Sequence, residues 1–193
     1  RGGGGRRDVA GAAAVKLLVD IGNTRVKWAW LDAGGALREP GGLAHAGAVP
    51  EGWPGVVLGG RRPEAVLAAS VAAPALAAAL LGPLAPAGVP LEQAAVEREA
   101  AGVRNGYADP RQLGVDRWLA VLAARALHPT AVCVVDAGTA VPVDAVDAAG
   151  QHLGGFIVPG AGLMRRALLE RTGGIAVAAG LAGGADGARP GPP

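Results

Sequence analysis

The stretch "LLVDIGNTRVKWAWLD", residues 17–32, has an unusual end for a hydrophobic strand. An apolar run ends in Asp20 and passes directly into Gly-Asn-Thr (22–24), with Lys27 three residues further on. Glycine lets a backbone turn approach a ligand closely, and the Asn and Thr side chains add donors beside exposed N–H groups. A hairpin would return the Lys27 ammonium to the same place. The pattern suits phosphate oxygens; a tight β-turn closed by an Asx hydrogen bond is the alternative.

A second stretch repeats this design. "VVDAGTAV", residues 134–141, again joins an apolar strand to Asp136, Gly138 and Thr139. Two such loops are what a two-lobed phosphate clamp needs, one from each lobe. An ionised aspartate repels phosphate unless a cation lies between them, so the pattern indicates a metal-bound nucleotide. Neither loop has the GxxxxGK[ST] pattern of a P-loop, and the chain has no GxGxxG.

Composition narrows the class of protein. The 193 residues are 51% hydrophobic, enough to bury one large or two small cores. A net charge of +2 without a basic stripe gives no support for nucleic-acid binding. Prolines interrupt the uncharged segment 65–91, which argues against a membrane span. The single cysteine, Cys133, is interpreted as a small buried hydrophobe in a reducing compartment. We therefore expect a soluble cytoplasmic protein.

Hydrophobic spacing predicts an alternation of strands and helices, which is typical of an α/β protein. The expected strands cover 15–22, 25–32, 65–73 and parts of 130–160, and the expected helices cover 74–85, 114–128 and 161–174. Segment 91–99 fits either. The tryptophans Trp28, Trp30 and Trp118 are expected in a core or interface rather than stacked on substrate. The histidines His45, His128 and His152 lack metal-ligand spacing.

Four motifs in order carry a family resemblance: "DIGNTRVKW", "NGYADPRQLGVDRW", "DAGTA" and "GGFIVPG". Together they resemble the type III pantothenate kinases of the acetate kinase/sugar kinase/Hsp70/actin superfamily. The resemblance runs from about Val15 to Thr172. It implies a two-lobed α/β fold of the actin-like (ribonuclease H-like) type with a truncated second lobe. The implied parts are a disordered leader (1–14), a first lobe carrying the base (15–128), a partial second lobe (129–185) and a disordered tail (186–193).

The same resemblance implies ATP-dependent phosphorylation of pantothenate to 4′-phosphopantothenate, the first step of coenzyme A biosynthesis. It implies Mg²⁺, a monovalent cation (K⁺ or NH₄⁺) and a homodimer, with no nucleic acid or membrane partner. Asp116 matches the family's proton acceptor, and Asp136 matches its monovalent-cation position. The positions that match ATP contacts are Asp20, Ile21, Gly22, Asn23, Thr24, Arg25, Val26, Lys27, Gly138 and Thr139. Those that match pantothenate contacts are Tyr107, Gly114, Val115, Asp116 and Arg117.

The chain departs from the family pattern at three places. Pro142 stands where a threonine is usual, which removes a hydroxyl and a backbone donor from a strand. The expected C-terminal adenosine motif is missing before "ARPGPP", and the leader has no counterpart. Two alternatives therefore stay open. One is a truncated, non-catalytic relative that acts as a binding or transcriptional accessory factor. The other is a superfamily kinase or phosphatase with another substrate, which "GVDR" disfavours.

Overall fold

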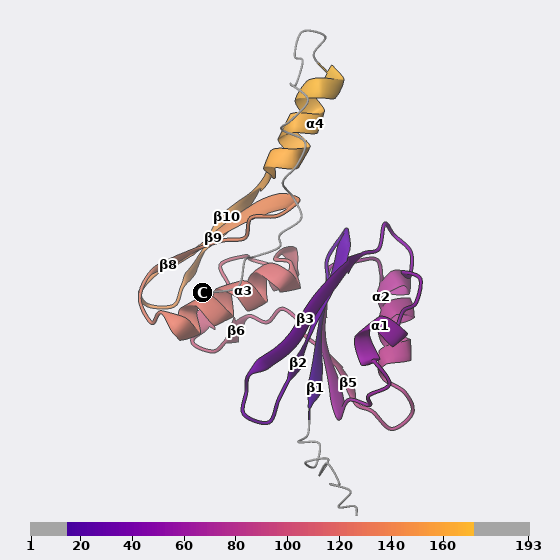
Figure 1. The fold of residues 1–193 in the computed structure, drawn as a ribbon. Coiled ribbons are helices and arrows are strands. Elements are labelled where there is room, and N and C mark those ends of the chain that lie inside the picture. Colours follow the sequence, from indigo (N-terminus) through magenta and orange to yellow (C-terminus); the bar gives the residue numbers. More distant parts are fainter. Residues whose placement is uncertain (1–14, 172–193) are drawn as a thin grey trace, which may run out of the picture.

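The computed structural model describes residues 15–171, so the expected leader and tail and the stretch after Arg171 lie outside it. A five-stranded sheet with the order β3-β2-β1-β4-β5 forms the first part (Figure 1). β1 (Lys16–Ile21), β2 (Arg25–Leu31) and β3 (Leu37–Ala44) are antiparallel neighbours. β4 (Ala65–Ser70) runs parallel to β1, and β5 (Leu91–Gln93) runs parallel to β4.

Short helices make the crossovers to the parallel strands. α1 (Gly55–Leu58) precedes β4, whereas α2 (Pro74–Leu81) and the 3₁₀ helix η1 (Gly82–Leu84) precede β5. Pro74 begins α2, where its fixed φ suits the first helical turn. Both α-helices cover the same face of the sheet (Figure 1).

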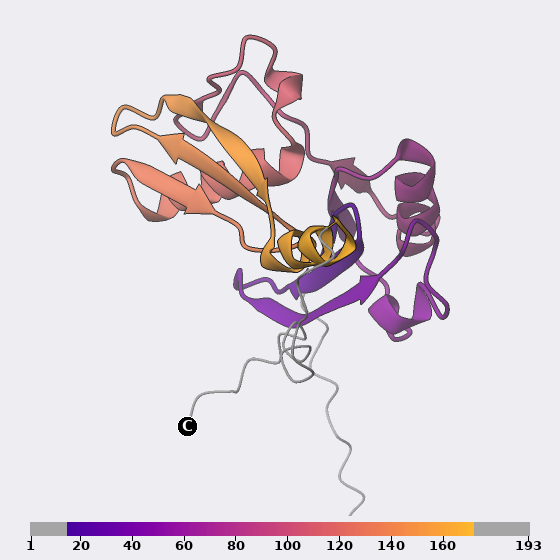
Figure 2. The same cartoon turned by 90° about the horizontal axis from the view of Figure 1, so that it is seen from above.

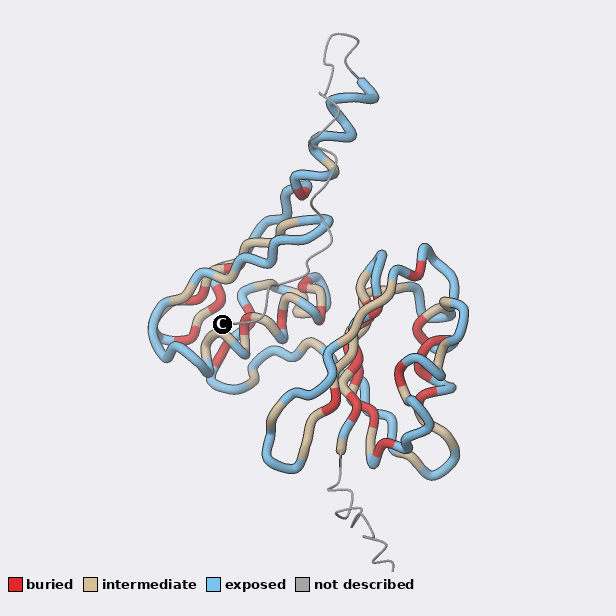
Figure 3. The backbone as a smooth tube through the Cα atoms, in the orientation of Figure 1, coloured by how far each residue is buried: buried red, intermediate tan, exposed pale blue. Residues whose placement is uncertain are grey.

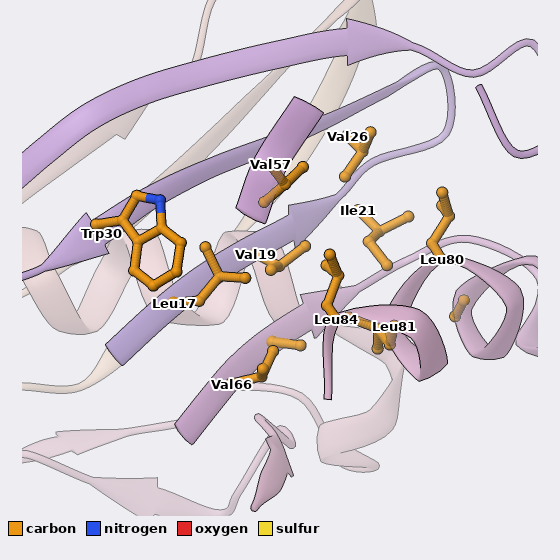
Figure 4. Close-up of a cluster of buried hydrophobic side chains, with 12 residues drawn as sticks. Leu17, Val19, Ile21, Val26, Trp30, Val57, Val66, Leu80, Leu81 and Leu84 are labelled. Atoms are coloured by element: carbon orange, nitrogen blue, oxygen red, sulfur yellow. The ribbon is translucent and has the colours of Figure 1, made fainter. Parts of the chain in front are cut away.

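A tightly buried cluster lies between this face and the two helices (Figure 4). Leu17, Val19 and Ile21 alternate along β1 and all point into it, as expected for a strand with one covered face. The other fully buried members include Val26, Trp30, Val57, Val66, Leu80, Leu81 and Leu84. Each large apolar side chain contributes about 1.5–3 kcal/mol by burial. The cluster therefore stabilises β1 and β2, the two strands that flank the first phosphate-loop candidate.

The second part begins with a two-stranded ribbon, β6 (Glu99–Ala100) and β7 (Val103–Arg104), and the 3₁₀ helix η2 (Pro110–Gln112). α3 (Val115–Leu127) follows. The remaining elements are β8 (Val132–Val135), β9 (Ala140–Val146), β10 (His152–Pro159) and α4 (Ala161–Arg171). The three strands form an antiparallel sheet in the order β10-β9-β8. In both views this sheet and α3 lie beside the first sheet (Figures 1 and 2).

A second buried cluster joins α3 to the antiparallel sheet. Trp118 and Val121 of α3 pack with Val103 of β7 and Val146 of β9, and with Leu113, which precedes α3. The cluster draws residues from both sides of position 128, so α3 shares its core with β9. The division of the chain into lobes at residue 128 stays a prediction.

Several sequence predictions can now be compared with the structure. The strands and helices expected around β1, β2, β4, α2, α3 and α4 are present. Segment 91–99 contains no helix: it holds β5 and the first residue of β6, with irregular backbone between them. Trp30 and Trp118 are core residues, as expected. No helix within residues 15–171 is long and apolar enough to cross a membrane.

The prediction that Cys133 is buried is wrong. Its thiol is exposed because it lies on the face of β8 that is turned away from the second cluster, whereas the alternate residues Val132 and Val134 turn toward that cluster. Leu119 and Leu127 of α3 are also exposed, although both fit the helical spacing. Exposure continues along α4, none of whose residues is buried (Figure 3).

Candidate active site

The first candidate loop is the tip of the β1–β2 hairpin. Gly22 N–H donates to the Arg25 carbonyl at 2.9 Å and closes the turn. Asp20 and Lys27 are directly paired across the two strands, and Lys27 Nζ lies 3.6 Å from Asp20 Oδ2. Both side chains are partly exposed, so the carboxylate and the ammonium are both accessible to a ligand.

The eight predicted residues of this loop divide by the direction of their side chains. Asn23, Thr24 and Arg25 are exposed at the tip. Ile21 and Val26 are fully buried in the first core, so only their backbone groups face the loop. The polar side chains of the hairpin tip are therefore exposed to solvent, and its apolar side chains pack in the first core.

Three carboxylates distant in the sequence converge near this tip. Burial raises the pKa of Asp20 above its ordinary value; Lys27 opposes this rise, and the negative charges of Asp116 and Asp136 add to it. The start of α3 and the end of β8 therefore both lie within electrostatic range of the end of β1. Charge repulsion of this kind is typical of a site that binds cations.

The second candidate loop joins β8 to β9. Gly138 N–H donates to the Ala140 carbonyl at 3.1 Å, and Gly160 N–H donates to the Thr139 carbonyl at 2.9 Å. A Cβ on Gly160 would collide with the Gly138 carbonyl, so the end of β10 requires glycine there. The last glycine of the "GGFIVPG" motif therefore packs directly against the backbone of this loop. Asp136, Gly138 and Thr139 are all exposed.

Pro142 lies in β9 without disrupting it. Its carbonyl accepts a hydrogen bond from Asp136 N–H at 3.2 Å, so its nitrogen also faces the β8 side. The last pair between β8 and β9 is Val135 with Val143, one residue earlier in the ladder. The missing N–H of Pro142 thus falls where β8 has ended, and no bond to β10 is lost. The lost threonine hydroxyl remains a difference from the family pattern.

Asp116 lies in the first turn of α3. Gly114 precedes the helix as its N-terminal cap, and Asp116 Oδ1 accepts the Arg117 N–H at 2.8 Å. The Asp116 side chain is exposed, whereas Val115 is buried and can contribute only its backbone to a ligand. A carboxylate near a helix N-terminus is stabilised by the helix dipole.

Arg117 is held by residues that the sequence reasoning did not select. Its Nε and Nη2 donate to the two oxygens of Asp144 at 2.8 and 2.6 Å. His152 Nε2 lies 2.9 Å from Asp144 Oδ1, and both Asp144 and His152 are buried. The bonds to Asp144 raise the pKa of Arg117 above its ordinary value. A charged residue alternating with apolar ones in a predicted strand was the available signal for Asp144.

Tyr107 belongs to the same network. Its ring lies 5.7 Å from the His152 ring, and its hydroxyl reaches the Gly155 carbonyl at 3.4 Å. The Tyr107 side chain also contributes to the raised pKa of Arg117, after Asp144. The structure therefore brings together Tyr107, Gly114, Asp116 and Arg117, which the sequence placed in one group.

A cavity of about 590 Å³ is lined by residues of β1, β2, β4 and β5 and by Leu119 of α3. Asp20 and Lys27 line one part of it, and the rest is mostly apolar, including Trp28, Leu67 and Leu119. Tyr107, Arg117 and the second loop do not line it. The cavity therefore adjoins the candidate site at the Asp20–Lys27 pair only.

The arrangement of carboxylates limits how a cation could be held. Within residues 15–171, no group of three His, Cys, Asp or Glu side chains forms a metal site on its own. Mg²⁺ is commonly bound by one or two carboxylates together with nucleotide phosphates. The partly exposed carboxylate of Asp20 fits that mode of binding.

Comparison with known proteins identifies the relatives of this chain. The family model described as type III pantothenate kinase matches residues 16–186. The type III pantothenate kinase of Halorhodospira halophila is 47% identical over 82% of this chain and 65% of its own length. That of Azoarcus sp. is 45% identical over 82% of this chain and 60% of its own length. The chain thus spans less than two thirds of these relatives.

A solved structure supports the fold. A Baf family protein from Campylobacter jejuni superposes with a TM-score of 0.50 at 22% identity, over 81% of this chain and 61% of that protein. At that identity the likeness concerns the fold alone. The predicted α/β fold class of the actin-like type is confirmed.

Proposed function

The chain belongs to the type III pantothenate kinase family, and from that premise we propose that it phosphorylates pantothenate to 4′-phosphopantothenate with ATP, the first step of coenzyme A biosynthesis. The observation that carries the proposal is the pair of strand–Asp–x–Gly loops, with Asp116 and Asp136 both within electrostatic range of Asp20. The non-catalytic accessory role is not favoured, because the curated relatives are named as kinases.

In this proposal, Asp116 accepts the proton of the pantothenate hydroxyl while the oxygen of that hydroxyl attacks the γ-phosphorus of ATP. The bond between that phosphorus and the β–γ bridging oxygen breaks, and ADP leaves. Lys27 and the backbone N–H groups of both loops hold the phosphates in line, since positioning and charge stabilisation supply most of the catalysis of phosphoryl transfer. Mg²⁺ at Asp20 would neutralise charge that develops on the phosphate oxygens. Asp136 would hold a monovalent cation.

Tyr107 and Arg117 would place pantothenate. Asp144 engages Nε and one N–H of Nη2 of Arg117, so the N–H groups of Nη1 and the second N–H of Nη2 are left for Tyr107 and the substrate carboxylate. Because Asp144 also balances the charge of Arg117, recognition of the carboxylate would rely on hydrogen-bond direction more than on net charge.

We also propose that the protein is a cytoplasmic homodimer. Leu153, Phe156 and Ile157 on β10 are between 58% and 65% exposed, and Met164 on α4 adds to the same part of the chain. Apolar exposure of this kind marks interaction surfaces. Analytical ultracentrifugation of the protein and of the Phe156→Ser variant would test a second copy as the occupant: dissociation of the variant supports it, and a monomeric wild type contradicts it.

A coupled assay of ADP release tests the kinase reaction. The reaction contains pantothenate, ATP, Mg²⁺ and K⁺, and the Asp116→Asn variant is compared with Glu51→Gln, a neutralising change at an exposed position. We expect pantothenate-dependent turnover that falls by at least about 100-fold in Asp116→Asn and persists in Glu51→Gln. Folded wild-type protein without turnover would contradict the proposal.

A further inference from the structure

His45 is a buried residue that no motif of the sequence explains. It follows the last residue of β3 and is only 4% exposed. Its Nε2 lies 2.8 Å from the Gly22 carbonyl, and its backbone N–H donates to the Thr24 carbonyl at 3.1 Å. His45 thus forms two hydrogen bonds with the first phosphate loop, one to Gly22 and one to Thr24.

The turn after β3 fixes the tautomer of the His45 ring. Gly47 N–H donates to Nδ1 at 3.1 Å, so Nδ1 is the acceptor and Nε2 carries the hydrogen that goes to Gly22. Ala46 and Gly47 both have positive φ, 44° and 84°, and Ala48 N–H closes the turn on the His45 carbonyl at 2.7 Å. A positive φ is unfavourable for alanine, so the surrounding contacts hold this turn in place.

The bond to Gly22 determines where the next amide points. In a trans peptide the C=O and the following N–H point in opposite directions, so the captured Gly22 carbonyl turns the Asn23 N–H away from His45. No hydrogen-bond acceptor for that N–H occurs in the part of the chain that the structure describes. Asn23 is exposed at the tip, beside the Asp20–Lys27 pair.

We propose that His45 is a positioning residue for nucleotide binding: it orients the first phosphate loop so that the Asn23 N–H donates to a phosphate oxygen. This inference rests on the proposed function, because it takes the loop to bind a nucleotide. A histidine with a purely structural role would change stability alone. A positioning role predicts a selective effect on nucleotide affinity.

Calorimetric titration with Mg-ADP tests the role of His45 in three proteins. His45→Phe keeps the ring and loses both side-chain bonds, whereas His45→Gln retains a donor that can reach the Gly22 carbonyl. We expect about five- to tenfold weaker Mg-ADP binding for His45→Phe, the effect of one lost hydrogen bond, and a change within about twofold for His45→Gln. In the coupled assay His45→Phe should raise KM for ATP and leave KM for pantothenate unchanged.

The outcomes separate this inference from the proposed function. A wild-type protein that does not bind Mg-ADP contradicts the proposed function and the inference together. If wild type binds and folded His45→Phe binds equally well, only the inference is overturned. A second measurement covers the case in which His45→Phe does not fold. The Asn23 amide resonance of wild type should shift with Mg-ADP and not with adenosine, and an unchanged resonance would overturn the inference.

Discussion

Arg117 and Asp144 form a bidentate pair in the interior of the second part of the protein. The two bonds measure 2.8 and 2.6 Å, and the side chains are 10% and 3% exposed. Since Arg117 directly follows Asp116, this pair connects the first turn of α3 to β9. Arg117, which is proposed to bind pantothenate, therefore also stabilises the packing of α3 on β9.

The Arg117→Gln substitution should destabilise the protein strongly. It leaves the Asp144 carboxylate buried with His152 as its remaining side-chain partner, and loss of one member of a buried ion pair costs about 3–5 kcal/mol. Urea unfolding followed by tryptophan fluorescence measures this change, because Trp118 lies in the same core.

Arg111→Gln is the matched control for that substitution. Arg111 also forms a bidentate pair, with Asp109 at 3.0 Å for both bonds, but its side chain is 86% exposed. Exposed pairs contribute little because water screens them. Equal losses of stability in both variants would contradict the view that burial makes the Arg117 pair important.

Gly155→Ala should disrupt the same pair from the opposite side. A Cβ at this position would collide with Asp144 Oδ1 and with the Val143 carbonyl, and would lie 2.5 Å from Arg117 Nη2. Because a backbone carbonyl is among the obstacles, the strand itself has to shift. We expect a lower melting temperature and a raised KM for pantothenate. Gly162→Ala in α4 meets nothing within 4 Å and should leave both quantities unchanged.

The sequence predicted the features that a short stretch determines by itself. The two strand–Asp–x–Gly loops, the Pro74 start of α2 and the helix after Gly114 each depend on neighbours a few residues away. Their local patterns were sufficient because apolar alternation, glycine and proline restrict the backbone directly.

Features that depend on distant partners could not be predicted. His45 contacts Gly22 across 23 positions, and Arg117 contacts Asp144 across 27, so neither pair leaves a local pattern. Cys133 was misjudged for a similar reason. An all-apolar strand suggests burial on both faces, but whether a face is covered depends on which elements pack against it.

Asp20→Asn should raise the melting temperature at neutral pH while it weakens Mg-ADP binding. The folded-state pKa of Asp20 is raised above 3.8, so the folded protein favours the neutral carboxyl. Wild-type stability from this group is therefore lost as the pH rises from about 3.8 through the folded pKa. An uncharged side chain avoids that loss. The gain should vanish below pH 3.8, and thermal unfolding at a series of pH values measures it.

Asp32→Asn provides a control of the opposite sign. The pKa of Asp32 is lowered, first by the hydrogen bond from Ala36 N–H and then by Arg38. Its stabilising effect is present above 3.8 and is lost as the pH falls through the lowered pKa. This variant should melt at a lower temperature at neutral pH. A rise in melting temperature for both variants would contradict the assigned electrostatics.

Gly114→Ala should reduce turnover and leave the fold intact. A Cβ there would lie 2.5 Å from Asp116 Oδ1, while the next nearest atoms, Asp116 Cγ and Val71 Cγ1, would be 3.7 Å away. The backbone of Gly114, with φ −61° and ψ 142°, accepts alanine without strain. Only the carboxylate proposed as base has to move, and a misplaced catalytic group costs about 100-fold in rate.

Steady-state kinetics and thermal unfolding together test this substitution. We expect kcat to fall by about 10- to 100-fold, with KM for ATP and the melting temperature near the wild-type values. Gly55→Ala, at the start of α1 with nothing within 4 Å of its Cβ position, should behave as wild type. An unchanged kcat in Gly114→Ala would mean that the position of the Asp116 carboxylate does not limit the reaction, and Asp116 would then lose its assignment as the base.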